Sequence, residues 1–395
     1  MNSTRKTIIL DQGEVIGGAE CYMRDFITSL AESDAKMLGL RVLGAQHPEY
    51  KAAIPDYIPR EDFTFPSVKG GMFSKAIAAM KIFLTGQKIA KICRKKQINT
   101  IVTNTARSHF ITLMSKIFFR NKSRWIVIMH DFETQKSFWK LIHTRINHLI
   151  FSRADNIVSV SSLSNKILKE MIPQKFHKKI RLVENAIKLN QITEELRPTN
   201  IETVLIPRRY DPYKGQKLII EAAHLLHERN PELQFLFHGA VFAEDPKCAK
   251  YHAECVEYTA KHNLENVELK RHTSDPYGKI LAADLVIVPA MVPETFGRIV
   301  IEALAMGKLV LSFDETGPRE ITKEFMRFAE RESGMTLPSL IVPKNPMTIA
   351  EMLGEIADNP DKYLPYTQYG RAFVERYYDF KNTKKTMTRL LINAV

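Results

Sequence analysis

The sequence predicts an α/β protein made of two doubly wound domains, each built on a parallel sheet. At 395 residues the chain is too long for one hydrophobic core, so two domains of ordinary size are expected. Short runs rich in β-branched residues alternate with longer helical stretches, which is typical of parallel strands covered by helices on both faces. The alternation stops in a polar stretch near residues 188 to 202 and then starts again.

The expected strands fall into two series. The first consists of "TIILD", "TIVTN", "WIVIMHD", "NIVSVSS" and "IRLVEN", and the second of "TVLIP", "LQFLFHG", "NVELK", "DLVIVP", "KLVLSF" and "SLIVP". We therefore predict an N-terminal domain over residues 1–188 and a C-terminal domain over residues 202–379. The last helical stretch, residues 380–395, has no strand after it, and we expect it to cross back onto the N-terminal domain.

Hydropathy and cysteine usage suggest a cytoplasmic protein. No apolar run approaches the length that spans a bilayer, and the polar start "MNSTRK" is not followed by the apolar core of a signal peptide. The four cysteines are widely spread and form no CxxC pair, which suits a reducing compartment.

The net charge of +13 is concentrated in one part of the chain, residues 63–130, which holds thirteen Lys and Arg and no acidic residue. Within it Ile77, Met80, Leu84 and Ile92 recur at helical spacing among lysines, the pattern of a basic amphipathic helix. Such a helix suits an anionic membrane surface, while a solvated face and a nucleic-acid surface are the alternatives. We favour the membrane, with the protein held peripherally at the inner face of the cytoplasmic membrane.

Two loops after predicted strands carry groups that suit phosphate, since doubly wound sheets bind ligands at the carboxyl ends of their strands. Gly17 and Gly18 precede a helix, where backbone amides and the helix dipole can receive a phosphate; a tight turn is the alternative. In "IPRRYDPYKGQK", Arg208 and Lys214 would suit a diphosphate, unless both are merely solvated.

A third loop, in "PETFGRIVIEALAMG", carries two carboxylates. Glu294 follows a strand, Phe296 and Gly297 open a helix, and Glu302 lies about two turns further along. At that separation the two glutamates cannot share a proton if the helix is regular. We predict that each accepts hydrogen bonds from a different part of one polyhydroxylated ligand; a capping glutamate and an exposed helix glutamate are the alternative.

One further cluster contains residue types that bind metals. "KCAKYHAEC" places Cys248, His252 and Cys255 on one face of a helix. Three ligands from a single helix cannot close a structural zinc site, and no fourth ligand is evident, so these residues are interpreted as structural. No acidic pair of the DxD type sits in the loops described above, and no metal is expected.

The motif "PETFGRIVIEALAMGKLVL" resembles the E-x7-E signature of retaining glycosyltransferases of family 4. That family has the GT-B fold, in which two Rossmann-like domains face each other across a cleft. "GGAE", "SVSS", "VENAI" and "PRRYDPYKG" resemble other motifs of the family and occur in the same order. The chain differs from the family in having Pro207 at a usual glycine, and Glu184, Asn185 and Ala186 at a usual Pro-Asn-Gly.

The resemblance implies an N-terminal acceptor domain and a C-terminal donor domain for a nucleotide sugar. It implies these catalytic residues: His130, Arg208, Lys214 and Glu294. His130 would reach the donor sugar, Arg208 and Lys214 would neutralise the leaving diphosphate, and Glu294 would contact the transferred sugar.

The resemblance also implies a set of substrate-binding residues: Gly17, Gly18, Thr295, Phe296, Gly297, Arg298, Ile299 and Glu302. The amides of the two N-terminal glycines would approach the diphosphate. The backbone amides of residues 296–299 would hold the sugar and the phosphate. Glu302 would accept hydrogen bonds from the ribose hydroxyls.

The implied function is a metal-independent, retaining hexosyltransferase that moves a sugar from a UDP- or GDP-linked donor to a lipid-linked or glycan acceptor. The setting would be bacterial-type synthesis of cell-surface polysaccharide or glycolipid, with no nucleic-acid partner and no cofactor besides the donor. A GT-B nucleotide-sugar epimerase and a catalytically silent GT-B binding subunit are the alternatives. The donor, the acceptor, the linkage, the oligomeric state and the choice between front-face transfer and double displacement stay open.

Overall fold

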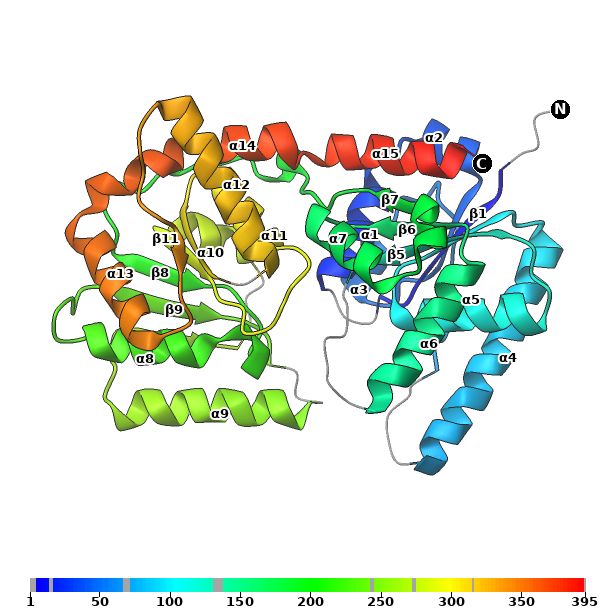
Figure 1. The fold of residues 1–395 in the computed structure, drawn as a ribbon, viewed down its shortest axis with the longest axis horizontal. Coiled ribbons are helices and arrows are strands. Elements are labelled where there is room, and N and C mark those ends of the chain that lie inside the picture. The colour runs from blue at the N-terminus through cyan, green and yellow to red at the C-terminus, as the bar shows by residue number, and fades with distance from the viewer. Residues whose placement is uncertain are drawn as a thin grey trace. The chain divides into compact units, whose positions relative to one another are not determined.

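The computed structural model consists of two compact α/β units (Figure 1). It describes the backbone of residues 5–13, 17–66, 72–130, 138–241, 245–271, 275–314 and 316–393. The first unit comprises Met1–Asn185 together with Phe380–Val395, and the second comprises Ala186–Asp379. Each unit is built on one sheet whose strand pairs are all parallel, so the predicted fold class is confirmed.

The sheet of the first unit has seven strands in the order β3-β2-β1-β4-β5-β6-β7. Their bounds are β1 Thr7–Asp11, β2 Leu40–Gly44, β3 Arg60–Glu61, β4 Thr100–Thr103, β5 Arg124–Met129, β6 Asn156–Ser159 and β7 Ile180–Leu182. β2 and β3, which form one edge of this sheet, were not predicted from the sequence. The strand order reverses between β1 and β4, and loops that follow strands at such a reversal form the usual binding crevice of a doubly wound sheet.

Helices on both faces cover this sheet: α1 Gly18–Ser29, α2 Glu32–Leu38, α3 Pro48–Ala53, α4 Met72–Lys96, α5 Ala106–Phe118, α6 Phe138–Arg153, α7 Ser162–Met171 and α15 Phe380–Ile392. The last of these, α15, belongs to this unit although it follows the whole second unit in sequence (Figure 1). Arg5 donates a hydrogen bond to the carbonyl oxygen of Leu391 at 3.0 Å, and Lys384 pairs with Asp34 at 3.2 Å. These contacts tie α15 to the start of the chain.

Small residues set the packing of α4 on α5. A Cβ atom on Gly86 would lie 2.8 Å from the Cβ atom of Met114, so the two helices approach closely there. Ile89 and Ala90 are buried on the same side of α4, whereas the side chains of Met80 and Leu84 are 58% and 52% exposed. Of the regularly spaced apolar residues, Ile92 packs on the core of the unit, whereas Met80 and Leu84 do not.

The sheet of the second unit has six strands in the order β10-β9-β8-β11-β12-β13. Their bounds are β8 Thr203–Ile206, β9 Gln234–His238, β10 Val267–Lys270, β11 Leu285–Val288, β12 Leu309–Phe313 and β13 Ile341–Val342. All six correspond to predicted strands. The helices are α8 Gln216–Leu226, α9 Pro246–Lys261, α10 Pro276–Ala282, α11 Arg298–Ala305, α12 Thr316–Ser333, α13 Pro346–Asp358 and α14 Gly370–Tyr377.

The two ends of the second unit lie side by side. Ile187 and Asp379 form a parallel bridge, and the amide of Ile187 donates to the carbonyl oxygen of Tyr378 at 3.1 Å. The segment that begins the unit is therefore hydrogen-bonded to the segment that ends it.

Candidate functional site

The predicted site residues form two sets, one in each unit. In the second unit, Arg208 and Lys214 lie in the loop after β8. The buried amide of Gln216 donates to the carbonyl oxygen of Arg208 at 3.1 Å, which anchors the start of the loop. Gly215 has φ of 73°, and a Cβ atom there would lie 3.2 Å from Sδ of Met291, so the end of the loop packs on the loop after β11.

Glu294 accepts hydrogen bonds from both Arg208 and Lys214, and the three side chains form one ion cluster. Their exposed fractions are 16%, 6% and 21%, so water screens the cluster little. Burial raises the pKa of Glu294, but the two cations outweigh burial and bring it below its usual value. Burial and the charge of Arg208 lower the pKa of Lys214, which Glu294 opposes. With Glu294 as a carboxylate and both bases charged, the cluster carries one excess positive charge.

The family resemblance implied that Glu294 contacts the sugar and that Arg208 and Lys214 contact the diphosphate. It did not imply a contact among the three side chains. β8 and β11 are neighbours in the sheet, so the loops that follow them start side by side. The contact among the three side chains could not be predicted without this strand order.

The loop that holds Glu294 is hydrogen-bonded to the start of α12 and packs against it. The amide of Gly317 donates to the carbonyl oxygen of Glu294 at 2.8 Å. A Cβ atom on Gly297 would lie 2.8 Å from Cα of Pro318, so only glycine fits at the start of α11 without a shift. Three more predicted residues lie at or just before the first turn of α11, all buried or partly buried: Thr295, Phe296 and Ile299.

Glu302 is 9% exposed, so it is not the exposed helix glutamate of the alternative interpretation. It accepts from Nε of Arg298 at 2.8 Å and from the hydroxyl of Tyr277 at 3.4 Å. Arg298 also donates to the carbonyl oxygen of Ala186 at 3.4 Å. The two glutamates therefore have separate partners. Tyr277 was missed because no motif surrounds it.

In the first unit, Gly17 caps α1 and Gly18 begins it, and both are exposed. A Cβ atom on Gly18 would meet nothing within 4 Å, so this glycine leaves room for an approaching group. The amide of Gly17 donates to the carboxylate of Glu20 at 3.0 Å. A phosphate at this helix start would therefore meet Glu20, which the sequence reading did not single out.

His130 follows β5 and is partly buried. Its Nε2 lies 2.7 Å from Oδ1 of Asn104, and its ring meets the ring of Tyr22 edge-on at 5.3 Å between centroids. Burial lowers the pKa of His130 to about 3, and the charge of His109 acts in the same direction. The imidazole is therefore neutral at pH 7.

Asp11 ends β1 and is fully buried. It accepts from the hydroxyl of Tyr50 at 2.9 Å and from Nδ2 of Asn104 at 3.1 Å. Burial raises the pKa of Asp11 to about 7, and the nearby charge of Glu20 adds to the rise. The sequence reading missed Asp11 and Asn104. The available signal was that three neighbouring strands, β1, β4 and β5, each end in or run into a polar residue.

Metal ligands do not gather in the described part of the chain, where no three His, Cys, Asp or Glu side chains form a possible site. Cys248, His252 and Cys255 lie on the buried side of α9, and the ring of His252 packs edge-on against Tyr210 at 4.5 Å between centroids. This agrees with their structural interpretation.

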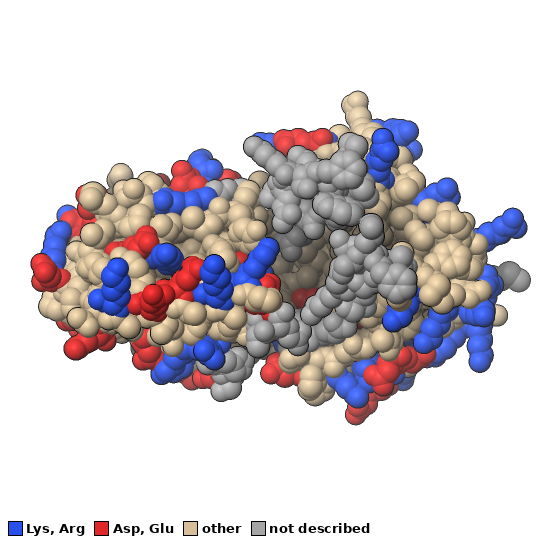
Figure 2. Space-filling model, turned by 90° about the horizontal axis from the view of Figure 1, so that it is seen from below, with Lys and Arg blue, Asp and Glu red and all other residues tan. Residues whose placement is uncertain are grey.

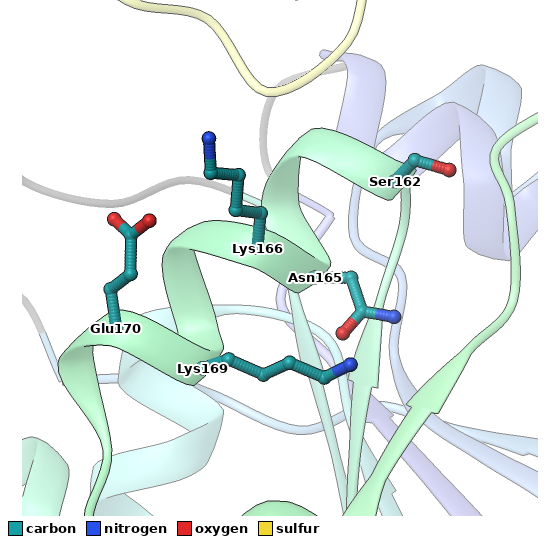
Figure 3. A pocket seen from close by; sticks show the side chains of 5 residues that line it. All are labelled: Ser162, Asn165, Lys166, Lys169 and Glu170. Atoms are coloured by element: carbon teal, nitrogen blue, oxygen red, sulfur yellow. The ribbon is translucent and has the colours of Figure 1, made fainter.

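A surface depression lies along α7, and no predicted site residue lines it. Its lining comes from that helix alone: Ser162, Asn165, Lys166, Lys169 and Glu170 (Figure 3). In Figure 3 Lys166 and Glu170 project from one side of the helix, and Asn165 and Lys169 from the other. Side chains that diverge in this way do not converge on a ligand.

Comparison with known proteins places these residues in context. Residues 188–373 match the family described as glycosyl transferases group 1. No curated protein matches the sequence. Among solved structures, HepE of Anabaena in complex with UDP is 18% identical over 98% of this chain and 99% of its own, with a TM-score of 0.73.

Two further solved structures agree over their whole lengths. A glycosyltransferase of Rickettsia africae is 18% identical, covers 99% of this chain and 100% of its own, and has a TM-score of 0.74. Sucrose-phosphate synthase of Thermosynechococcus elongatus is 18% identical, covers 98% of both chains, and has a TM-score of 0.74. The chain has the GT-B fold. The residues that match the family, 188–373, all belong to the second unit.

The raised pKa of Asp11 makes stability depend on pH. Between its ordinary pKa of 3.8 and about 7, the folded state holds more protons than the unfolded state. The free energy of unfolding should therefore fall as pH rises through that window, by about 1.4 kcal/mol per unit of pKa shift in total. Asp11→Asn removes this loss, so its stability relative to the parent should be greater at pH 8 than at pH 5 in urea denaturation.

The exposed Asp56→Asn is the matched control for this prediction and should show no such gain. A difference between Asp11→Asn and parent that stayed constant from pH 5 to pH 8 would contradict it.

Proposed function

We propose that the protein is a retaining glycosyltransferase of family 4 that transfers a hexosyl group from a nucleotide sugar. The carrying observation is the ion cluster, in which Glu294 binds both Arg208 and Lys214 at the carboxyl ends of two neighbouring strands. These strands belong to the unit that matches glycosyl transferases group 1. The seven residues between Glu294 and Glu302 fit the family signature, and both glutamates have the separate environments that two ligand contacts require.

The cluster suits a leaving diphosphate. When the bond from the anomeric carbon to the diphosphate oxygen breaks, its electron pair leaves with the oxygen, and negative charge develops there. Arg208 and Lys214 are preorganised and largely shielded from water, so they stabilise that charge strongly. Two such cations can supply the charge that a divalent ion supplies elsewhere, which supports transfer without a metal.

The same cluster supports front-face transfer over double displacement. Two cations hold the pKa of Glu294 below its usual value and so stabilise it as an anion. A carboxylate stabilised in this way is a poorer nucleophile toward the anomeric carbon. In the front-face route, the acceptor hydroxyl bonds to the face that the diphosphate leaves, and its proton passes to the departing oxygen. Glu294 then orients the sugar and the cations.

A UDP-linked sugar is the first donor to test. HepE has been solved with UDP and with UDP-glucose, and TarM of S. aureus with UDP. In this proposal His130, Gly17 and Gly18 keep the donor contacts that the family resemblance implies.

Glu294→Gln should lower turnover strongly while UDP binding persists. Losing one preorganised electrostatic contact costs about 2.7–4 kcal/mol, or roughly 100- to 1,000-fold in rate. Arg208 and Lys214 lose their carboxylate partner in this variant, so the thermal shift that UDP induces should be at least as large as in the parent. Release of UDP from UDP-glucose measures turnover, with Glu351→Gln on the exposed face of α13 as the control. Turnover at the parent rate would overturn the site.

Arg208→Ala and Lys214→Ala should each reduce the thermal shift that UDP induces and slow the release of UDP. A ligand at ~100 times its dissociation constant adds about 2.7 kcal/mol of stability, so weaker binding is readily visible.

Excess EDTA should leave the parent enzyme unaffected. Activity that EDTA abolishes and Mg²⁺ or Mn²⁺ restores would show that the mechanism needs a metal.

We also propose that the first unit docks on an anionic membrane, which supports a lipid-linked acceptor. Four large apolar side chains of α4 and α5 are exposed: Met80 (58%), Phe83 (38%), Leu84 (52%) and Phe118 (57%). The rings of Phe83 and Phe118 lie 5.3 Å apart and form the centre of this apolar group. No helix in the described part of the chain is long and apolar enough to cross a bilayer.

Basic side chains accompany the apolar group. Seven are exposed within residues 77–130, where the structure describes the side chains: Lys81, Lys88, Lys91, Arg94, Lys95, Arg120 and Lys122. Figure 2 shows mainly blue side chains along the right-hand edge, where the first unit is drawn. Two lysines of α4 also contact other residues of the unit, since Lys96 pairs with Glu61 and Lys88 lies 5.2 Å from the ring centre of Phe63. Each cation near an anionic bilayer contributes about 1 kcal/mol, so the exposed set suffices for reversible binding.

The double change Lys91→Glu and Lys95→Glu should abolish sedimentation with phosphatidylserine vesicles. The binding should also weaken with salt, because the Debye length falls from ~10 Å at 0.1 M to ~3 Å at 1 M. Lys247→Glu with Lys261→Glu, two exposed positions on α9, is a control of equal charge that should leave sedimentation unchanged. Equal sedimentation with phosphatidylcholine vesicles, or no loss in the test variant, would show that these lysines form a solvated face.

A further inference from the structure

The side chain of Asn104 connects three elements of the first unit. It follows β4 and is 2% exposed. Its Nδ2 donates to the carbonyl oxygen of Ala19, in the first turn of α1, at 2.9 Å. Nδ2 also donates to Asp11, at the end of β1, at 3.1 Å, and Oδ1 lies 2.7 Å from Nε2 of His130, after β5.

These contacts determine which ring nitrogen of His130 carries the proton. The carbonyl oxygen of Ala19 can only accept, so the nitrogen of the Asn104 amide must face it. The amide oxygen of Asn104 then faces His130, and because that oxygen can only accept, Nε2 must carry a hydrogen. The imidazole is neutral, since burial lowers the pKa of His130 to about 3. Its Nδ1 is therefore unprotonated and acts as a hydrogen-bond acceptor.

We propose that Asn104 is a positioning residue that holds His130 as the Nε2-protonated tautomer and links it to the start of α1. This inference rests on the proposed function, in which His130 contacts the donor sugar. An unprotonated Nδ1 accepts a hydrogen bond from a sugar hydroxyl, whereas a protonated Nδ1 could only donate one to the hydroxyl oxygen. The same amide bonds Ala19, so one side chain sets both His130 and the helix that begins at Gly18.

Asp11 supports the Asn104 amide without controlling its orientation. Its carboxyl group is held by the hydroxyl of Tyr50, and the charges of Glu20 and Arg24 act on this pair. Asp11 changes protonation near neutral pH, but the carbonyl oxygen of Ala19 stays an acceptor at every pH. The tautomer of His130 should therefore be the same at pH 6 and at pH 9.

The tautomer can be read directly by ¹⁵N NMR of protein labelled at its histidines, with His130→Gln identifying the His130 signals. The parent should show Nε2 protonated and Nδ1 unprotonated at pH 6 and pH 9. Asn104→Ala, or the milder Asn104→Ser if the alanine variant does not fold, should give a mixture of both tautomers. Asn121→Ala is the matched control, because Asn121 is also buried and its Nδ2 donates to Ser115 at 2.9 Å.

The inference fails if the parent holds Nδ1 protonated or a charged ring at pH 7, or if removing Asn104 leaves the tautomer unchanged. Release of UDP from UDP-glucose supplies the second readout, with kcat expected to fall about 100-fold in Asn104→Ala and to persist in Asn121→Ala. A changed tautomer with parental kcat would support the positioning role and overturn the proposed contact of His130 with the sugar.

Discussion

Parallel pairing of buried strands is the constraint on which both candidate residue sets depend. Most strand residues in the two sheets are buried, and strands covered on both faces leave little room for charged side chains. Because every pair is parallel, the loops after the strands all begin at one edge of each sheet. Polar groups are therefore brought together there, as in Asp11 with Asn104 and in Arg208 with Glu294.

The two sets have opposite electrostatic character. The second unit presents two cations with one carboxylate, and such a buried cluster persists only because its members compensate the desolvation of one another. The first unit presents the neutral imidazole of His130, which Asn104 links to Asp11, together with the exposed start of α1 at Gly18. Under the proposed function, side-chain charge would hold the phosphate in the second unit, and the helix amides would approach it in the first.

Local patterns predicted the strands well where apolar runs were long and bounded, as in all six strands of the second unit. The pattern failed for β3, which has only two residues, Arg60–Glu61, and no apolar character. The apolar spacing in α4 gave no sign of the contact at Gly86, because a close approach between helices depends on a small residue and hydropathy does not register one. The sequence shows only that Asn104 follows a strand, because a single amide has no periodicity and its role depends on partners up to 93 residues away.

The paired ends of the second unit have a consequence for synthesis on the ribosome. Domains generally fold in the order in which they emerge, the N-terminal one first. Here the first unit lacks α15 until residues 380–392 have been made, whereas the second is complete once its closing segment reaches Ile187. The second unit can therefore finish folding before the first, which still lacks α15. Until α15 docks, the surface of the first unit that buries Phe380, Met387 and Leu391 stays exposed on the nascent chain.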